Sequence, residues 1–272
     1  MAFVEANGTT LFVEESGEGE PMVFVHGSCV DQSTWFLVAP DLASSFRTLT
    51  YDRRGHGKSP PGHGRGSIDE DVEDLAALLR ALDLPAAHLV GNSFGASIAL
   101  RLAVRYPDRV RTLSVHEPPL VFYLAEDLEQ IPVLEELVRI GGEIVERVTR
   151  GDVAGGARQF VDELALGSGG WKSLPESQRQ VFIDNVRTWL DEQDEPGAYD
   201  IDRAALAKFP RPVLLSEGGR SPKHVRRVTQ KIAAETLPRA RHVFVEEWGH
   251  IPHLTHPAAY AAMVKEFAQS GK

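Results

Sequence analysis

Residues 91–95 read Gly91-Asn92-Ser93-Phe94-Gly95, and this short stretch decides the fold that we predict. It matches the pattern G-x-S-x-G, whose glycines permit a tight turn around a central serine. The apolar pair Leu89-Val90 precedes the turn, and helical periodicity begins at Phe94. A strand, a sharp turn and a helix in this order raise the serine hydroxyl above the carboxyl edge of a sheet, where open α/β sheets bind ligands. Ser93 is therefore a candidate nucleophile, and a serine that only caps a helix is the alternative.

Strand and helix patterns alternate on both sides of this turn. Asn7-Gly8, between short apolar segments at 4–6 and 11–14, predicts a hairpin. Apolar runs predict further strands at 22–25, 46–51, 87–90, 110–115, 212–215 and 242–246. Apolar residues at spacings of three and four predict helices at 68–84, 94–106, 225–234 and 257–269. The alternation predicts an α/β fold with a mostly parallel central sheet and helices on both faces.

The alternation stops in the middle of the chain. From residue 118 to residue 209 helical periodicity dominates, and glycines at 141–142, 155–156 and 167–170 predict breaks between helices. We therefore predict one α/β core, formed by residues 1–117 and 210–272. The helical insertion at 118–209 follows the sixth strand of the sheet.

The composition limits the expected partners. The chain of 272 residues has 29 basic and 39 acidic side chains, a formal charge of −10, which argues against nucleic acids and anionic membranes. No apolar run reaches the roughly 18 residues of a membrane span. The first residues lack the pattern of a secretory signal, and the single cysteine, Cys29, cannot form an internal disulfide. We therefore expect a cytoplasmic protein that acts on a small molecule.

A serine hydroxyl is a weak nucleophile until a base takes its proton. His250 is the best candidate base, because it follows a predicted strand late in the chain, in the order serine, acid, histidine. His253 and His256 complete an H-x2-H-x2-H pattern with it. Three imidazoles at that spacing converge on a metal only in a helix, and nearby prolines oppose a regular helix there. We expect neither a metal ion nor another cofactor.

Four motifs follow one another along the chain: His26-Gly27-Ser28 after an early strand, the segment 52–59 with the sequence DRRGHGKS, the turn at 91–95, and Gly249-His250 followed by Pro257. Together they resemble the α/β-hydrolase family, in particular its capped, serine-nucleophile branch of esterases, lactonases and C–C hydrolases. The resemblance covers nearly the whole chain. It implies the α/β-hydrolase fold, with the insertion as a cap over the substrate pocket.

The resemblance also implies an oxyanion hole and a pocket. The backbone N–H groups of Ser28 and Phe94 would be the two donors to the oxyanion. His26 would brace the loop that carries Ser28. We expect the substrate to contact residues around this site, namely His26, Cys29, Trp35, Asn92, Phe122 and His253.

The triad acid departs from the usual pattern of the family. Most members place an aspartate a few residues after the strand at 212–215, where this chain has Ser221. Some members take the acid from the end of the preceding strand, where Glu117 stands, and we prefer Glu117. Pro118 is expected to hold Glu117 in an extended conformation. Glu217 and a dyad without an acid are the alternatives.

Ser93 also selects among the reactions of the family. Members that open epoxides or displace halide use an aspartate nucleophile, so a serine argues against that chemistry. We expect Ser93 to form an acyl-enzyme on an ester, thioester or lactone of a small to medium apolar substrate, with His250 as general base. Hydrolytic C–C cleavage of a diketone is one alternative, and a receptor, acyltransferase or lyase is another. The chain could act as a monomer or as a homodimer.

Overall fold

The computed structural model describes residues 1–62, 66–195 and 197–271. These residues form an eight-stranded sheet with the order β1-β2-β4-β3-β5-β6-β7-β8. The antiparallel part is β1 (Ala2–Ala6) and β2 (Thr9–Ser16), which pairs with β4 (Arg47–Tyr51). The parallel neighbours are β3 (Pro21–Val25), β5 (Ala87–Asn92), β6 (Val110–His116), β7 (Val213–Gly218) and β8 (Arg241–Val245). The predicted mostly parallel α/β fold is confirmed.

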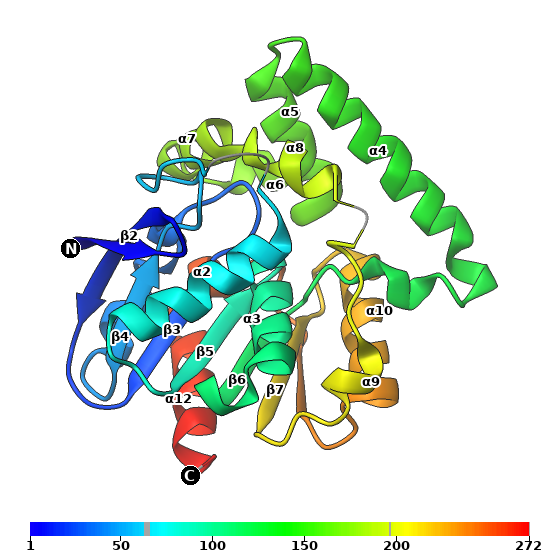
Figure 1. Ribbon diagram of the computed structural model, residues 1–272. Helices are drawn as coiled ribbons and strands as arrows, with labels where there is room; N and C mark the ends of the chain where they lie inside the picture. Colours follow the sequence, from blue (N-terminus) through cyan, green and yellow to red (C-terminus); the bar gives the residue numbers. More distant parts are fainter. Residues whose placement is uncertain (63–65, 196, 272) are drawn as a thin grey trace.

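Helices cover both faces of this sheet (Figure 1). In the view of Figure 1, α2 (Ile68–Ala81) and α3 (Phe94–Arg105) lie in front of the strands, and α12 (Pro257–Ser270) lies behind them. The helix α10 (Lys223–Lys231) follows β7, and the short α1 (Ala39–Leu42) and α11 (Pro252–Thr255) lie in loops. Four-residue α1 and α11 were not among the predicted helices, since one turn carries too little periodicity.

The buried faces explain why β3 is an unbroken apolar run. Val23 and Val25 belong to the apolar cluster shared with α2 and α3, whereas Met22 and Phe24 belong to the cluster shared with α12. Successive side chains of a strand point to opposite faces, so a strand that is covered on both sides needs an apolar residue at each position.

The local signals set most element boundaries. Asn7 and Gly8 have φ of 48° and 73°, as the predicted hairpin turn requires. At the start of α2, Ser67 Oγ accepts the backbone N–H of Glu70 at 3.1 Å, an N-cap. The helix ends at Ala81, before the predicted residue 84, because Asp83 turns to a φ of 54° and the N–H of Leu84 returns to the carbonyl of Leu79 at 2.8 Å.

A helical insertion lies between β6 and β7, above the carboxyl edge of the sheet (Figure 1). Its α-helices are α4 (Ile131–Thr149), α5 (Val153–Gln159), α6 (Gly170–Ser173), α7 (Glu176–Asn185), α8 (Thr188–Gln193) and α9 (Arg203–Leu206). Shorter 3₁₀ or π-helical segments are η3 (Val121–Leu124), η4 (Leu128–Gln130) and η5 (Phe160–Ala165). Among its described residues there is no strand, which agrees with the predicted helical insertion after the sixth strand.

Two predicted breaks in the insertion are wrong. Gly141 and Gly142 lie inside α4, and Gly155 and Gly156 lie inside α5. A Cβ atom at Gly156 would stand 2.4 Å from Cγ2 of Val148. This glycine therefore serves the close packing of two helices rather than a turn. The glycines at 167 and 169 do have positive φ and separate η5 from α6, as predicted.

The insertion has an apolar cluster of its own that continues into the core. Ile144, Val161 and Val186 belong to it together with Cys29 and Ile251, which lie on loops at the carboxyl edge of the sheet. None of the helices in the described ranges has the length and apolar character that a membrane span needs.

Candidate active site

Ser93 stands on a strained turn between β5 and α3. Its φ of 54° and ψ of −126° are a conformation that side-chain-bearing residues rarely adopt. Glycine is required on both sides: a Cβ at Gly91 would lie 2.6 Å from the carbonyl oxygen of Gly95, and one at Gly95 would lie 2.2 Å from that of Val25. The backbone N–H of Ser93 donates to the carbonyl of His116 at 2.9 Å. The turn thus projects the hydroxyl from the sheet edge.

His250 lies beside this turn, on the loop between β8 and α11. Asn92 Nδ2 donates to the backbone carbonyl of His250 at 2.9 Å, and this bond ties the loop to the residue before the serine. His250 is buried to all but 5% of its surface. Ser93 and His250 line the same cavity. The structure therefore brings the candidate nucleophile and the candidate base together.

Glu117 completes the arrangement. His250 Nδ1 donates to Glu117 Oε2 at 2.7 Å, and the backbone N–H of Gly218 donates to Glu117 Oε1 at 2.8 Å. With Nδ1 engaged, Nε2 is the ring nitrogen that can accept the proton of Ser93. The expectation that Pro118 keeps Glu117 extended is wrong, because Glu117 has a φ of 48°. This left-handed turn ends β6 and directs the carboxylate at His250 and Gly218.

The Glu117 carboxylate is fully buried yet ionised. Burial acts to raise its pKa, but the adjacent imidazoles of His116 and His250 and the N–H of Gly218 outweigh burial and lower the pKa to about 2. A buried carboxylate with several donors keeps its charge. It can therefore orient the imidazole and stabilise the imidazolium that forms when Ser93 loses its proton.

His116 is a part of the site that we did not predict. Its Nε2 donates to the carbonyl of Gly249 at 3.2 Å, and its Nδ1 lies 3.0 Å from the hydroxyl of Ser216. Burial lowers the pKa of His116 to about 4, so the ring is neutral at pH 7. It braces the loop that carries His250. The available signal in the sequence is its place at the end of the β6 strand, directly before Glu117.

Glu217, the alternative acid, is engaged elsewhere. It is 2% exposed and accepts hydrogen bonds from Gln230 Nε2 at 3.0 and 3.2 Å. His242 Nε2 lies 3.0 Å from its Oε1. These contacts hold Glu217 between β7, β8 and α10, whereas Glu117 holds His250.

Ser28 and Phe94, whose N–H groups are the predicted oxyanion donors, both lie beside Ser93. Phe94 is the first residue of α3, so its N–H has no partner within the helix. Ser28 lines a small cavity together with Ser93 and His250. A Cβ at the preceding Gly27 would lie 3.1 Å from Cβ of Ser93, which shows how closely this loop approaches the serine.

His26 stabilises the same loop through two hydrogen bonds. Its Nε2 accepts the backbone N–H of Arg53 at 2.9 Å, and its Nδ1 donates to the carbonyl of Gly27 at 2.9 Å. Burial and the charge of Arg53 hold the pKa of His26 well below its usual range, so the ring is neutral.

Four of the predicted substrate contacts are core residues. Besides His26, these are Cys29, Trp35 and His253, none more than 1% exposed and none lining the cavities that Ser93 lines. Trp35 packs against Phe24 and against His253, whose Nε2 lies 2.9 Å from Oγ1 of Thr34. The residues pair with neighbours in the core instead of facing a ligand. Asn92 lines the small cavity, and Phe122 lines the larger one.

The larger cavity, of about 340 Å³, extends from Ser93 and His250 under the insertion. Its walls are mostly apolar, with Phe122, Leu134, Leu137, Phe160, Leu164 and Trp189 from the insertion. The polar side chains besides Ser93 and His250 are Gln193, Tyr199 and His224, and burial lowers the pKa of His224 to about 4. No lysine or arginine is among the described residues that line it. The cavity therefore suits an uncharged, largely apolar group.

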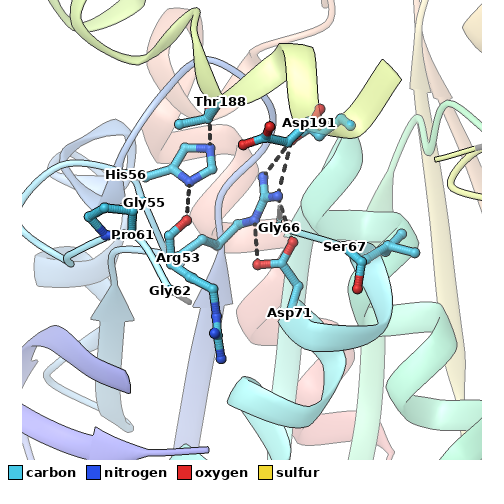
Figure 2. A pocket seen from close by; sticks show the side chains of 13 residues that line it. Arg53, Gly55, His56, Pro61, Gly62, Gly66, Ser67, Asp71, Thr188 and Asp191 are labelled. Atoms are coloured by element: carbon cyan, nitrogen blue, oxygen red, sulfur yellow. Dashed lines mark hydrogen bonds and ion pairs between the residues drawn. The ribbon is translucent and has the colours of Figure 1, made fainter. Parts of the chain in front are cut away.

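The DRRGHGKS segment builds a polar region next to the site (Figure 2). His56 Nδ1 donates to the carbonyl of Arg54 at 2.9 Å, and its Nε2 lies 2.8 Å from Oγ1 of Thr188 in α8. Arg53 forms an ion pair with Asp71 of α2, with Nη2 at 2.7 Å from Oδ2. Within the described ranges, no group of three or more histidine, cysteine or acidic side chains could hold a metal ion.

The chain is similar to known hydrolases over most of its length. A family model described as "Alpha/beta hydrolase family" matches residues 22–263. The 2-hydroxymuconate semialdehyde hydrolase of Pseudomonas sp. (strain CF600) is 30% identical, over 96% of this chain and 91% of that protein. The pimeloyl-[acyl-carrier protein] methyl ester esterase of Aeromonas hydrophila subsp. hydrophila is 27% identical, over 95% and 99%. The crystal structure of an alpha/beta hydrolase from Sphaerobacter thermophilus DSM 20745 superimposes with a TM-score of 0.76 at 28% identity, over 98% and 99%.

Proposed function

The chain belongs to the α/β-hydrolase family, and we propose that this hydrolase cleaves an ester-type bond through an acyl-enzyme on Ser93. One observation carries the proposal: His250 shares a cavity with Ser93, and its Nδ1–H forms a hydrogen bond of 2.7 Å to the buried carboxylate of Glu117. A nucleophile, a base and a group that orients the base are the parts that acyl transfer by serine requires.

The proposed reaction has two halves. In the first, His250 Nε2 takes the proton of the Ser93 hydroxyl while the oxygen attacks the carbonyl carbon. The N–H groups of Ser28 and Phe94 bind the resulting oxyanion, and His250 then gives its proton to the leaving alcohol or thiol. In the second half, His250 takes a proton from water, the hydroxide attacks the acyl carbon, and the acid leaves as Ser93 recovers its proton. Glu117 stays ionised throughout.

The cavity supports an apolar acyl group as the substrate. Its walls are mostly apolar, and burial favours the neutral forms of His224 and Tyr199 by lowering the pKa of the first and raising that of the second. A charged group bound there would lose its hydration without gaining an opposite charge. We propose that residues 118–209 act as a cap, and that the acyl chain of an ester, thioester or lactone lies between this cap and Ser93.

Hydrolytic C–C cleavage is the second candidate. It is supported by the 30% identity to a hydrolase named for 2-hydroxymuconate semialdehyde. A muconate carries a carboxylate, which calls for a cation in the pocket. The described lining of this cavity offers no lysine or arginine, so the ester-type reaction is the better supported of the two.

A substrate panel tests the choice. We expect the purified protein to hydrolyse p-nitrophenyl acetate, butyrate and octanoate with a higher kcat/KM than a 2-hydroxy-6-oxo-dienoate, whose loss is followed by its own absorbance. Turnover of the dienoate with no ester hydrolysis would reverse the assignment. Failure of every substrate, together with tight binding of one of them, would point to a receptor.

A further inference from the structure

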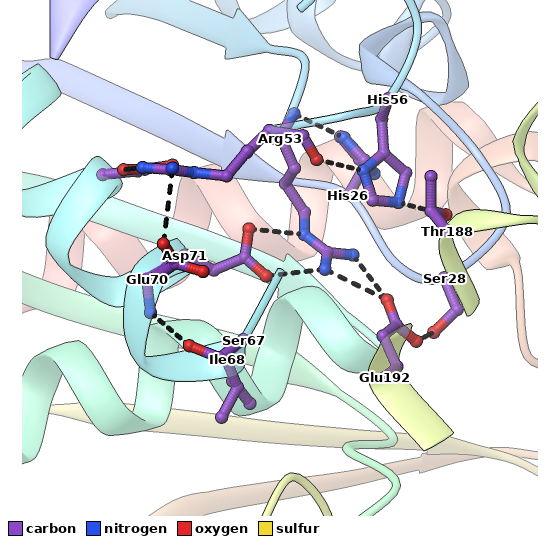
Figure 3. Close-up of polar contacts among 12 residues, drawn as sticks. His26, Ser28, Arg53, His56, Ser67, Ile68, Glu70, Asp71, Thr188 and Glu192 are labelled. Atoms are coloured by element: carbon purple, nitrogen blue, oxygen red, sulfur yellow. Dashed lines mark hydrogen bonds and ion pairs between the residues drawn. The ribbon is translucent and has the colours of Figure 1, made fainter. Parts of the chain in front are cut away.

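A buried carboxylate of the insertion reaches the loop that carries Ser28. Glu192 lies in α8 and is 5% exposed. Ser28 Oγ donates to Glu192 Oε2 at 2.5 Å, and Arg53 donates to Glu192 Oε1 through Nη1 and Nη2, each at 3.0 Å (Figure 3). One side chain of the insertion thus binds two loops at the carboxyl edge of the sheet.

Arg53 links Glu192 to the surroundings of both predicted oxyanion donors. Its Nη1 donates to the carbonyl of Gly27, the residue before Ser28, at 3.3 Å. Its guanidinium carbon lies 4.8 Å from the centroid of the Phe94 ring. Asp71 of α2 fixes the guanidinium from the other side, with bonds of 3.1 Å from Nε and 2.7 Å from Nη2. Glu192, directly and through Arg53, contacts the residues whose N–H groups would bind the oxyanion.

We propose that Glu192 is a positioning residue that aligns the backbone N–H of Ser28 with that of Phe94. The position of the insertion on the core then controls the geometry of the oxyanion hole. The inference rests on the proposed function, because it needs an oxyanion at this place. A peptide N–H is directed only when its residue is fixed, and the bond from the Ser28 hydroxyl is of the strong, charge-assisted kind when Glu192 is ionised.

The charges around Arg53 indicate that the contacts of Glu192 do more than stabilise the fold. One guanidinium, that of Arg53, faces the two carboxylates of Asp71 and Glu192. Burial raises the pKa of Glu192 to about 7, although Arg53 and the Ser28 hydroxyl act in the opposite direction. A buried ionic group with excess negative charge adds less stability than apolar packing of the same volume. Its alignment of two loops is a benefit that apolar packing would not supply.

The contact region between the insertion and the core, called the seam below, offers a matched control in Glu195. Glu195 Oε2 accepts the backbone N–H of Ile68, the first residue of α2, at 2.7 Å. This bond also joins the insertion to the core, but it ends on the backbone of α2 and not on Ser28 or Arg53. Glu195→Gln therefore removes a charge from the seam without acting on the oxyanion position.

The test measures how fast Ser93 reacts, with a fluorophosphonate as the probe and p-nitrophenyl butyrate as the substrate. We expect Glu192→Gln to lower the second-order rate of phosphonylation and kcat by about tenfold to a hundredfold, with KM within twofold of the wild type. Ser28→Ala, which keeps the N–H but removes the hydroxyl, should lower both in the same way. The double variant should be no slower than Glu192→Gln alone, and Glu195→Gln should react like the wild type.

Equal phosphonylation rates and equal kcat in the wild type and Glu192→Gln would overturn the inference and leave the proposed function standing. Equal losses in Glu192→Gln and Glu195→Gln would overturn it too, because they would reveal a general effect of the seam. If Glu192→Gln does not fold, Ser28→Ala decides, since it keeps the pair of Arg53 and Glu192. A wild type that neither reacts with the probe nor hydrolyses esters would instead overturn the proposed function, and the inference with it.

Discussion

Glu117 is the residue whose role depends most on geometry. The N–H of Gly218 donates to Glu117, which in turn accepts Nδ1–H of His250, while Glu217, on the adjacent strand β7, accepts hydrogen bonds from Gln230. The two carboxylates are a chemically matched pair in different surroundings, so they can be compared directly.

We predict that Glu117→Gln lowers kcat by about a thousandfold to ten-thousandfold, because an amide in place of the carboxylate no longer fixes the tautomer of His250. Glu217→Gln should leave kcat within a few-fold of the wild type, although loss of its contacts with Gln230 and His242 costs some stability. Steady-state hydrolysis of p-nitrophenyl butyrate by the two variants checks this. The reverse ranking would assign the acid to Glu217.

The pKa of Glu117 also predicts a dependence of stability on pH. Its pKa is lowered in the folded protein, from 4.5 to about 2, so its contribution to folding is present above pH 4.5 and is lost as the pH falls toward 2. We expect the wild type to lose up to about 3 kcal/mol more unfolding free energy than Glu117→Gln over this range. Urea unfolding of both proteins at several pH values measures the difference. Parallel pH profiles would contradict an ionised, hydrogen-bonded Glu117.

For single residues, the sequence predicted that Ser93, His250 and Glu117 lie close together, but not the backbone conformation or burial of every predicted site residue. The strand–turn–helix order predicted the place of Ser93, and the end of the predicted strand at 110–115 predicted that of Glu117. The positive φ of Glu117 and the burial of Trp35 and His253 depend on contacts between segments far apart in the chain, such as the one from His253 to Thr34. No local pattern encodes those contacts.

Among the elements, α8 joins the insertion's apolar cluster to the cavity. Trp189 of α8 packs edge-on against Phe160, with ring centroids 5.3 Å apart, and lines the cavity that contains Ser93. Trp171 packs against the same apolar cluster but is not among the described residues that line this cavity. The two tryptophans therefore separate an effect on packing from an effect on substrate.

We predict that Trp189→Ala lowers the unfolding free energy by about 3 kcal/mol and shifts the preference among acyl chains toward octanoate, because the cavity beside Ser93 grows. Trp171→Ala should cost stability while leaving the ratio of octanoate to butyrate kcat/KM unchanged. Thermal unfolding and the kcat/KM series of p-nitrophenyl esters check both. An equal shift of the octanoate to butyrate ratio in both variants would contradict the assignment of Trp189, and not Trp171, to the cavity wall.

Element boundaries followed from local signals where these are strong. The start of α2 at Ile68 and the turn at Asn7-Gly8 are short-range features, and both agree with the predictions; the N-cap at Ser67 was not predicted. The glycines within α4 and α5 led to wrong predictions of helix breaks. At Gly156, close packing of two helices outweighs the cost of glycine in a helix. Only the three-dimensional neighbour, Val148, reveals that reason.

The whole molecule is an α/β core whose sheet edge is roofed by helices (Figure 1). The alternation of strand and helix predicted the core, and the loss of alternation predicted the helical insertion. The orientation of the insertion could not be predicted, because it depends on single long-range contacts such as those of Glu192 with Ser28 and Arg53. The negative net charge of −10 has no part in the proposed site, whose cavity is apolar.

The most direct test of the account is the intact mass of the protein after treatment with a fluorophosphonate, combined with ester turnover. The account predicts that the wild type gains one phosphonyl group, that peptide mapping places it on Ser93, and that p-nitrophenyl butyrate hydrolysis stops in proportion. Ser93→Ala, folded as judged by circular dichroism, should gain no such group and show no turnover above background. Undiminished hydrolysis by Ser93→Ala, or a stoichiometric adduct on another residue, would contradict the account.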